Sequence, residues 1–162
     1  MKIAVLSDTH GNVRPVSTAL DIIERKGIKT ILHCGDVGGE AIVQILAPFD
    51  AHIVGGNTDE WISLEKAVKT ANLDWQGAFG SLEIESVKIG FTHGHLTQRF
   101  IDEVQSGSWN LICYGHSHQE NYVIESNGTL LLNPGAFYRV PTPGFAIVTI
   151  DDAKITVEHI HI

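Results

Sequence analysis

The stretch "KIAVLSDTHG", residues 2–11, joins an apolar segment to a turn that carries an aspartate and a histidine. Residues 2–6 are mostly apolar on both faces, which is typical of a strand buried in a mainly parallel sheet. A helix should follow, because apolar residues recur at helical spacing over residues 16–23. Asn12 is the expected N-cap of this helix, and Gly27 is its expected C-terminal stop.

The same strand and helix pattern occurs a second time along the chain. Residues 30–34 ("TILHC") predict another buried strand, residues 42–49 an amphipathic helix and residues 51–54 a third strand. This order is βαβαβ, which forms a parallel sheet with right-handed crossovers.

The second half of the chain is rich in alternating, β-type patterns. We predict an α/β fold that is parallel in its first half and mostly antiparallel in its second, with residues 1–162 in one domain. The elements expected here are a helical stretch over 59–70, a hairpin within 81–92, a helix over 97–105, a strand over 111–114, a hairpin around Asn127-Gly128 and a hairpin around Asp151-Asp152.

Composition and charge narrow the class of protein. With 43% hydrophobic and 19% charged residues, the 162-residue chain is expected to form an ordinary globular core. The formal charge of −8 argues against stable nucleic-acid binding through phosphate neutralisation. No apolar run is long enough to cross a membrane, and the one at the start is too short for a signal peptide. We therefore expect a cytoplasmic protein with no membrane partner.

Almost every strand that is expected to be buried ends in a glycine-flanked group of metal-ligand residue types. In an open α/β sheet, ligands bind outside the carboxyl ends of the strands, so these groups should converge on one site. The five clusters are "SDTHG" (7–11), "CGD" (34–36), "GGNTD" (55–59), "THGH" (92–95) and "YGHSH" (114–118).

The donor types in these clusters suit divalent metal ions. Imidazole nitrogen with carboxylate or amide oxygen favours borderline ions such as manganese, iron, zinc or nickel. The donors are too many for one tetrahedral ion and about right for two ions, with Asp36 as the bridge. Because His116 and His118 are two residues apart on an extended segment, both can face one cavity. The seven expected metal ligands are Asp8, His10, Asp36, Asn57, His93, His116 and His118.

In order, these motifs resemble those of the calcineurin-like metallophosphoesterases, in particular the small prokaryotic phosphodiesterase branch. The resemblance covers most of the chain, from Met1 through the turn Asn133-Pro134-Gly135. It implies a four-layer αββα sandwich and a dinuclear site, usually active with manganese, in which a metal-bound hydroxide attacks phosphorus. It also implies that one ion is held by Asp8, His10 and His118 and the other by Asn57, His93 and His116, with Asp36 shared.

The chain departs from the family pattern after the motif asparagine. Relatives often have histidine or cysteine there, whereas this chain has Thr58, which is a poor acid for the leaving oxygen. His95 is our substitute, as a phosphate contact or proton donor, so the expected catalytic residues are Asp36, Asn57 and His95. Asp59 is expected to orient Asn57 or to cap the following helix.

The leading hypothesis is therefore a two-metal phosphodiesterase acting on a small phosphodiester or nucleotide-like substrate. The alternative is an interaction scaffold of the same fold, similar to a retromer subunit, with little or no catalysis; that reading predicts broken ligands, and all seven are present. A binuclear amidohydrolase ranks far behind, because such enzymes carry HxH where this chain has "DTH". The oligomeric state is left open, and the remaining histidines, His33, His52, His159 and His161, are expected to have no chemistry.

Overall fold

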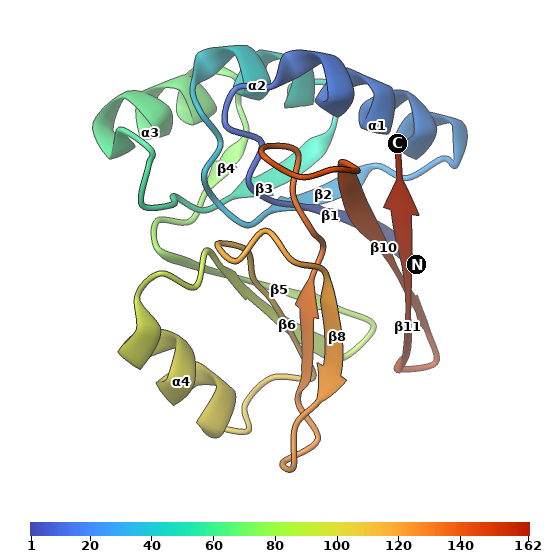
Figure 1. Cartoon of the computed structure of the whole chain (residues 1–162). Helices are drawn as coiled ribbons and strands as arrows, with labels where there is room; N and C mark the ends of the chain where they lie inside the picture. The colour runs from blue at the N-terminus through green and yellow to red at the C-terminus, as the bar shows by residue number, and fades with distance from the viewer.

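The computed structural model describes residues 1–162 and contains two β-sheets that pack against each other (Figure 1). Helices α1, α2 and α3 cover the outer face of one sheet, and α4 lies on the outer face of the other (Figure 1). The helices are α1 (Val13–Arg25), α2 (Glu40–Leu46), α3 (Trp61–Thr70) and α4 (Thr97–Gln105). These layers are the αββα sandwich that the family resemblance implied.

The first sheet has six strands in the order β11-β10-β1-β2-β3-β4. Its strands β1, β2 and β3 run parallel, as predicted from the βαβαβ pattern, while the hairpin β10-β11 adds antiparallel strands at one edge. The strands are β1 (Lys2–Leu6), β2 (Thr30–His33), β3 (Asp50–Ile53), β4 (Asp74–Trp75), β10 (Gly144–Asp151) and β11 (Lys154–His161).

The second sheet has five strands in the order β5-β6-β7-β9-β8. Its two outer pairs are the antiparallel hairpins that were expected, but the central strands β6, β7 and β9 are mutually parallel. The reason is that α4 forms a crossover between β6 and β7. The strands are β5 (Phe79–Ile84), β6 (Val87–Thr92), β7 (Leu111–Cys113), β8 (Asn121–Ile124) and β9 (Leu130–Asn133).

The structure differs from the sequence expectations at three places. Asn12 is the residue before α1, but its side chain makes no capping hydrogen bond and instead donates to the carbonyl oxygen of Phe137 at 2.8 Å. The short strand β4 was not expected at all; it pairs in parallel with β3. The turn of the last hairpin is Asp152-Ala153, one residue later than predicted, and both residues have positive φ.

Two apolar clusters hold the layers together. One fills the space between α1–α3 and the first sheet, with Val16, Leu20 and Ile42 among its buried members. The other lies between the two sheets and includes Val5 and Phe91. None of the four helices has both the length and the apolar character needed to span a lipid bilayer. The two clusters fix the sheets so that the carboxyl ends of their parallel strands lie at one common edge.

Candidate metal centre

The five polar clusters do converge at that edge. The backbone continues the pairing of β1 with β2 beyond the strands, since the N–H groups of Asp8 and His10 donate to the carbonyl oxygens of Gly35 and Asp36 at 3.1 and 2.9 Å. In the second sheet, the N–H of Gly115 donates to the carbonyl oxygen of His93 at 3.2 Å. Paired loops of this kind hold their side chains in a fixed arrangement.

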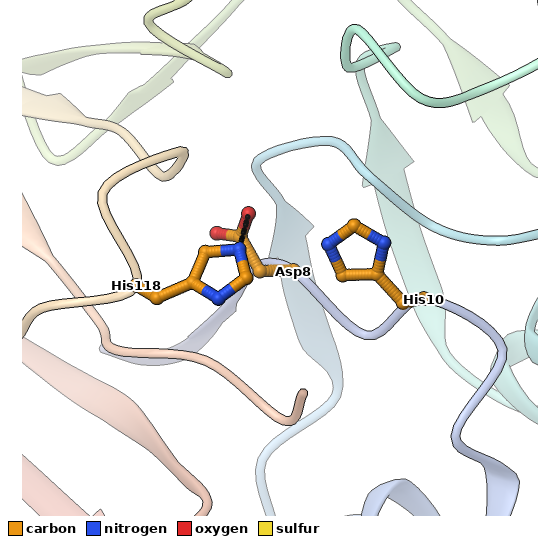
Figure 2. Close-up of side chains that lie close together, drawn as sticks. All are labelled: Asp8, His10 and His118. Carbon is orange, nitrogen blue, oxygen red and sulfur yellow. Dashed lines mark ion pairs between the residues drawn. The ribbon is translucent and has the colours of Figure 1, made fainter. Parts of the chain in front are cut away.

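One donor group consists of Asp8, His10 and His118 (Figure 2). The Nε2 atom of His118 lies 3.1 Å from the Oδ1 atom of Asp8, and the ring of His10 lies across from them with its centroid 5.4 Å from that of His118. Asp8 is fully buried and the two histidines are partly exposed. This is the set that the family resemblance assigned to one ion.

A second donor group consists of Asp8, Asp36 and His93, all buried. The Nε2 atom of His93 lies 3.3 Å from Asp36 Oδ2 and 3.0 Å from the Oδ1 atom of Asn57. Asp36 Oδ2 also lies 3.4 Å from the Nε2 atom of His10, which belongs to the first group. One carboxylate oxygen therefore faces both groups, which is the position expected of a bridging ligand.

Hydrogen bonds fix the orientation of two of the histidines. The Nδ1 atom of His93 lies 2.9 Å from the carbonyl oxygen of Cys34, and that of His118 lies 3.0 Å from the carbonyl oxygen of Tyr138. Because a carbonyl oxygen only accepts, Nδ1 carries a proton in both rings, and each Nε2 is the ring atom that faces the centre and is available to a cation. A metal-binding histidine commonly uses this arrangement.

Two of the donor atoms have no hydrogen-bond partner in the protein, which supports a site for divalent ions. Asp8 Oδ1 and His10 Nε2 are buried, and neither makes a hydrogen bond to a protein group. Leaving a buried polar atom without a partner is costly, so such atoms are rare in proteins and mark places where a water molecule or an ion can bind. Oxygen and imidazole nitrogen at the same point suit a borderline divalent cation.

The electrostatics of the site keep the carboxyl group of Asp36 ionised. Burial acts to raise the pKa of Asp36, but hydrogen bonds from His93 and from the N–H of Thr58 outweigh burial and hold the pKa well below its ordinary value. Burial acts to lower the pKa of His93, but its hydrogen bond to Asp36 and the charges of Asp8 and Asp36 raise the pKa. The pair is therefore stabilised as carboxylate and imidazolium in the absence of a cation, and a cation would replace that proton.

The local backbone is strained where the donors are. Few residues other than glycine adopt positive φ, and strain of this kind clusters at functional sites. The donors with positive φ are Asp8 (53°), His10 (44°), Asp36 (52°), His116 (69°) and His118 (56°).

Two glycines let the loops approach closely. A Cβ atom at Gly56 would overlap the carboxylate of Asp36, and one at Gly115 would overlap Ser7 and the Asp8 carboxylate. Only a residue without a side chain fits at these two positions. The glycines of the motifs thus hold carboxylates in place rather than only forming turns.

Two predicted residues lie toward the surface of the site. His116 is exposed, with its ring centroid 5.1 Å from that of His93, and its N–H donates to Asp8 Oδ2 at 3.1 Å. Asn57 is also exposed and contacts the centre through His93. His95 lies beside both histidines, with ring centroids 5.4 Å from His93 and 6.4 Å from His116. The structure thus places all three near the second group, where their roles stay predictions.

Asp59 does not cap α3, and its side chain makes no hydrogen bond to that of Asn57. Its carboxylate accepts hydrogen bonds from the N–H groups of Val37, Gly38 and Gly56, at 2.9–3.2 Å, and so ties the loop after β2 to the loop after β3. Glu60, not Asp59, caps α3, because its side chain accepts from the N–H of Ser63.

Sequence reasoning also missed a buried cross-link beside the donors. Thr9 donates its hydroxyl to the carbonyl oxygen of Val37 at 2.8 Å, and the Nε2 atom of His33 lies 3.0 Å from that hydroxyl oxygen. The hydroxyl proton is already used, so His33 is the donor of the second bond. The only sign of this cross-link in the sequence is the position of Thr9 between the expected ligands Asp8 and His10.

The remaining histidines lie apart from the donors. His52 pairs with Asp74 at 2.7 Å, His159 contacts the carbonyl oxygen of Asn133 at 2.9 Å, and His161 pairs with Glu120 at 2.8 Å. None belongs to either donor group.

Comparison with known proteins places this arrangement in a family. The model of a calcineurin-like phosphoesterase superfamily domain matches residues 1–153. A phosphodiesterase of Methanocaldococcus jannaschii is 30% identical over 139 residues, which cover 83% of each protein. These findings confirm the family predicted from the motifs and, with it, a hydrolase that acts on phosphoesters.

Solved structures agree with the fold. An archaeal phosphodiesterase, described as novel, superposes with a TM-score of 0.86 at 28% identity and covers 100% of both chains. Vps29 of Entamoeba histolytica, solved with zinc, has a TM-score of 0.72 at 21% identity over 99% of both chains. At that identity the likeness to Vps29 concerns the fold alone.

Proposed function

Because the chain belongs to the calcineurin-like phosphoesterase superfamily, we propose that it hydrolyses small phosphodiesters with the help of two divalent metal ions. The Methanocaldococcus jannaschii relative named a phosphodiesterase supports the diester as substrate. The open surface around His116 and Asn57, both exposed, leaves room for a substrate with two ester arms.

The observation that carries the proposal is the pair of buried atoms that make no hydrogen bond to a protein group. Asp8 Oδ1 and His10 Nε2 point into a centre where Asp36 and two further histidines also contribute donors. We propose Asp8, His10 and His118 as ligands of one ion, and Asn57, His93 and His116 as ligands of the other, with Asp36 shared. Manganese is the proposed metal, with iron, zinc and nickel as alternatives that fit the same donors.

Each group at the site is proposed to have a separate role in the reaction. When bound, the two ions supply an activated water and neutralise the charge of the phosphoryl group. Asp36 would connect the two ligand groups through Oδ2, which lies 3.4 Å from His10 Nε2 and 3.3 Å from His93 Nε2. Asn57 Oδ1, which lies 3.0 Å from His93 Nε2, would bind the same ion as His93. His95, beside the second group, is proposed to contact the phosphate or to protonate the leaving oxygen.

The test of this function is a metal-by-substrate screen on purified protein. Apo protein is loaded with manganese, zinc, iron or nickel and assayed with bis(p-nitrophenyl) phosphate and p-nitrophenyl phosphate. We expect metal-dependent hydrolysis of the diester, lost in Asp36→Asn and kept in Asp21→Asn, which changes an exposed carboxylate of α1. A monoester turned over much faster than the diester would contradict the diesterase assignment.

The alternative is a scaffold that binds a protein partner without catalysis. The likeness to Vps29 in fold is the observation in its favour. It predicts that metal-loaded wild-type protein is inactive on every phosphoester in the screen, whereas the enzyme proposal predicts turnover. We also propose that residues 1–162 act as one domain, since both apolar clusters draw on the two halves of the chain.

A further inference from the structure

A cavity of about 440 Å³ opens directly beside the first donor group. His118, whose Nε2 lies 3.1 Å from Asp8 Oδ1, forms part of its wall. The rest of the wall comes from Gln119 and Glu120 before β8, the loop after β9, the segment that leads into β10 and the end of β11, where His161 lies. A volume of this size lies within the range that holds small-molecule ligands.

The wall contains one carboxylate and two imidazoles, those of His118 and His161. Glu120 is the only carboxylate among the lining residues, and none of them is a lysine or an arginine. Glu120 Oε2 lies 2.8 Å from His161 Nε2, and both side chains are about half exposed, at 51%. Glu120 Oε1 has no hydrogen-bond partner in the protein and can accept a bond from a ligand.

Glu120 lies next to the loop that follows β9. Gly135 packs so that a Cβ at that position would lie 3.9 Å from Glu120 Cβ, and the neighbouring Asn133 carbonyl oxygen is held by His159 at 2.9 Å. His118 is itself fixed by its bond to the carbonyl oxygen of Tyr138. The carboxylate and the donor group therefore belong to connected, hydrogen-bonded loops.

We propose that this cavity receives the alcohol arm of the diester that stays on the phosphate, and that Glu120 selects an amino alcohol there. This proposal rests on the phosphodiesterase function above. A protonated amine can donate to Glu120 Oε1 and is attracted by its charge, while an arm carrying a carboxylate or a second phosphate meets the same charge and finds no lysine or arginine in the wall.

Four p-nitrophenyl phosphodiesters that differ only in the second arm test the selection: 2-aminoethyl, 2-hydroxyethyl, ethyl and 2-carboxyethyl. We expect kcat/KM of the manganese-loaded protein to be about fivefold higher for the aminoethyl than for the ethyl arm, and lowest for the carboxyethyl arm. Equal kcat/KM for all four, or preference for the carboxyethyl arm, overturns the proposal.

Variants of Glu120 sharpen the test, because the residue is exposed and its substitution should not disturb folding. Glu120→Gln should remove the preference for the aminoethyl arm, and Glu120→Lys should reverse it in favour of the carboxyethyl arm. The matched control is Glu24→Gln, an exposed carboxylate of α1 that lies outside the cavity, which should leave the ratios unchanged.

Binding of the products separates this proposal from the function on which it rests. Calorimetric titration of the manganese-loaded protein with phosphoethanolamine and with ethyl phosphate should give about fivefold tighter binding of the amine, lost in Glu120→Gln. If no diester is hydrolysed but this difference is found, the diesterase function fails and the cavity assignment stands. If diesters are hydrolysed but neither rates nor binding depend on Glu120, the cavity assignment fails alone.

Discussion

Asp8 and His118 come from the two different sheets, and their Oδ1 and Nε2 atoms lie 3.1 Å apart (Figure 2). Adjacent ligands of an ion with bonds of about 2.1 Å are separated by roughly this distance. The two donors are therefore already at ligand spacing, so binding would require little rearrangement of the protein. The apolar cluster between the two sheets maintains this distance, so the geometry of the metal site depends on the packing of the core.

Removal of one member of this pair should weaken metal binding. His118→Gln should lower manganese affinity by at least about tenfold, because Gln cannot place a nitrogen lone pair at the Nε2 position. Isothermal titration calorimetry measures the affinity. His52→Gln, which changes a histidine paired with Asp74 away from the donors, should bind manganese as the wild type does. Equal affinities for the two variants would contradict the assignment of His118.

The close approach at Gly56 predicts a second outcome. In Gly56→Ala the new methyl group would overlap the Asp36 carboxylate, so we expect about 1–3 kcal/mol of destabilisation together with a large loss of manganese affinity. Urea denaturation and calorimetry measure the two effects. Gly107→Ala is the control, since its positive φ of 64° also costs stability but nothing lies within 4 Å of the added Cβ. A Gly56→Ala protein with normal metal affinity would show that Asp36 can move freely.

His33 predicts the dependence of stability on pH. Burial lowers its pKa from 6.5 to about 4. Between these values the unfolded chain binds the proton and the folded chain does not, so stability falls as the pH drops from 6.5 toward 4. The loss assigned to His33 is about 3 kcal/mol at pH 4.

The measurement is urea denaturation of chelator-treated protein at pH 7.5 and pH 4. His33→Gln keeps a donor for Thr9 but does not titrate. The variant should therefore lose about 3 kcal/mol less than the wild type between the two pH values. Equal losses in the two proteins would mean that His33 is protonated in the folded state.

His95 is predicted to act on the substrate and not on the metal. His95→Gln should lower kcat for a phosphodiester by roughly a hundredfold, the usual loss on removing a general acid or base. Its manganese content, measured by elemental analysis, should match that of the wild type. If His95→Gln loses manganese, His95 belongs to the metal site. If the variant keeps full activity, His95 is not the proton donor and the leaving oxygen takes its proton from solvent.

Much of this structure could be predicted because its signals are local. The strands β1 and β2 are short apolar runs, and α4 begins and ends at the predicted residues Thr97 and Gln105. Convergence of the clusters followed from one rule about the ends of parallel strands. The same rule applies to the second sheet, where β6, β7 and β9 proved to be parallel.

What could not be predicted depends on contacts between distant segments. Asp59 binds three backbone N–H groups from two loops, and no pattern around it distinguishes that role from a helix cap. The strand β4 has two residues and exists only because β3 offers a free edge. The link between His33 and Thr9 requires two neighbouring strands in the right register.

The most direct measurement is the number of manganese ions bound per chain, obtained by titrating chelator-treated protein and by elemental analysis after removal of free metal. Our account predicts two ions in the wild type and at most one in Asp8→Asn. The rate of phosphodiester hydrolysis should be proportional to the fraction of protein that holds two ions. A single ion per chain in a fully active wild type, or two ions retained in Asp8→Asn and Asp36→Asn, would contradict the account.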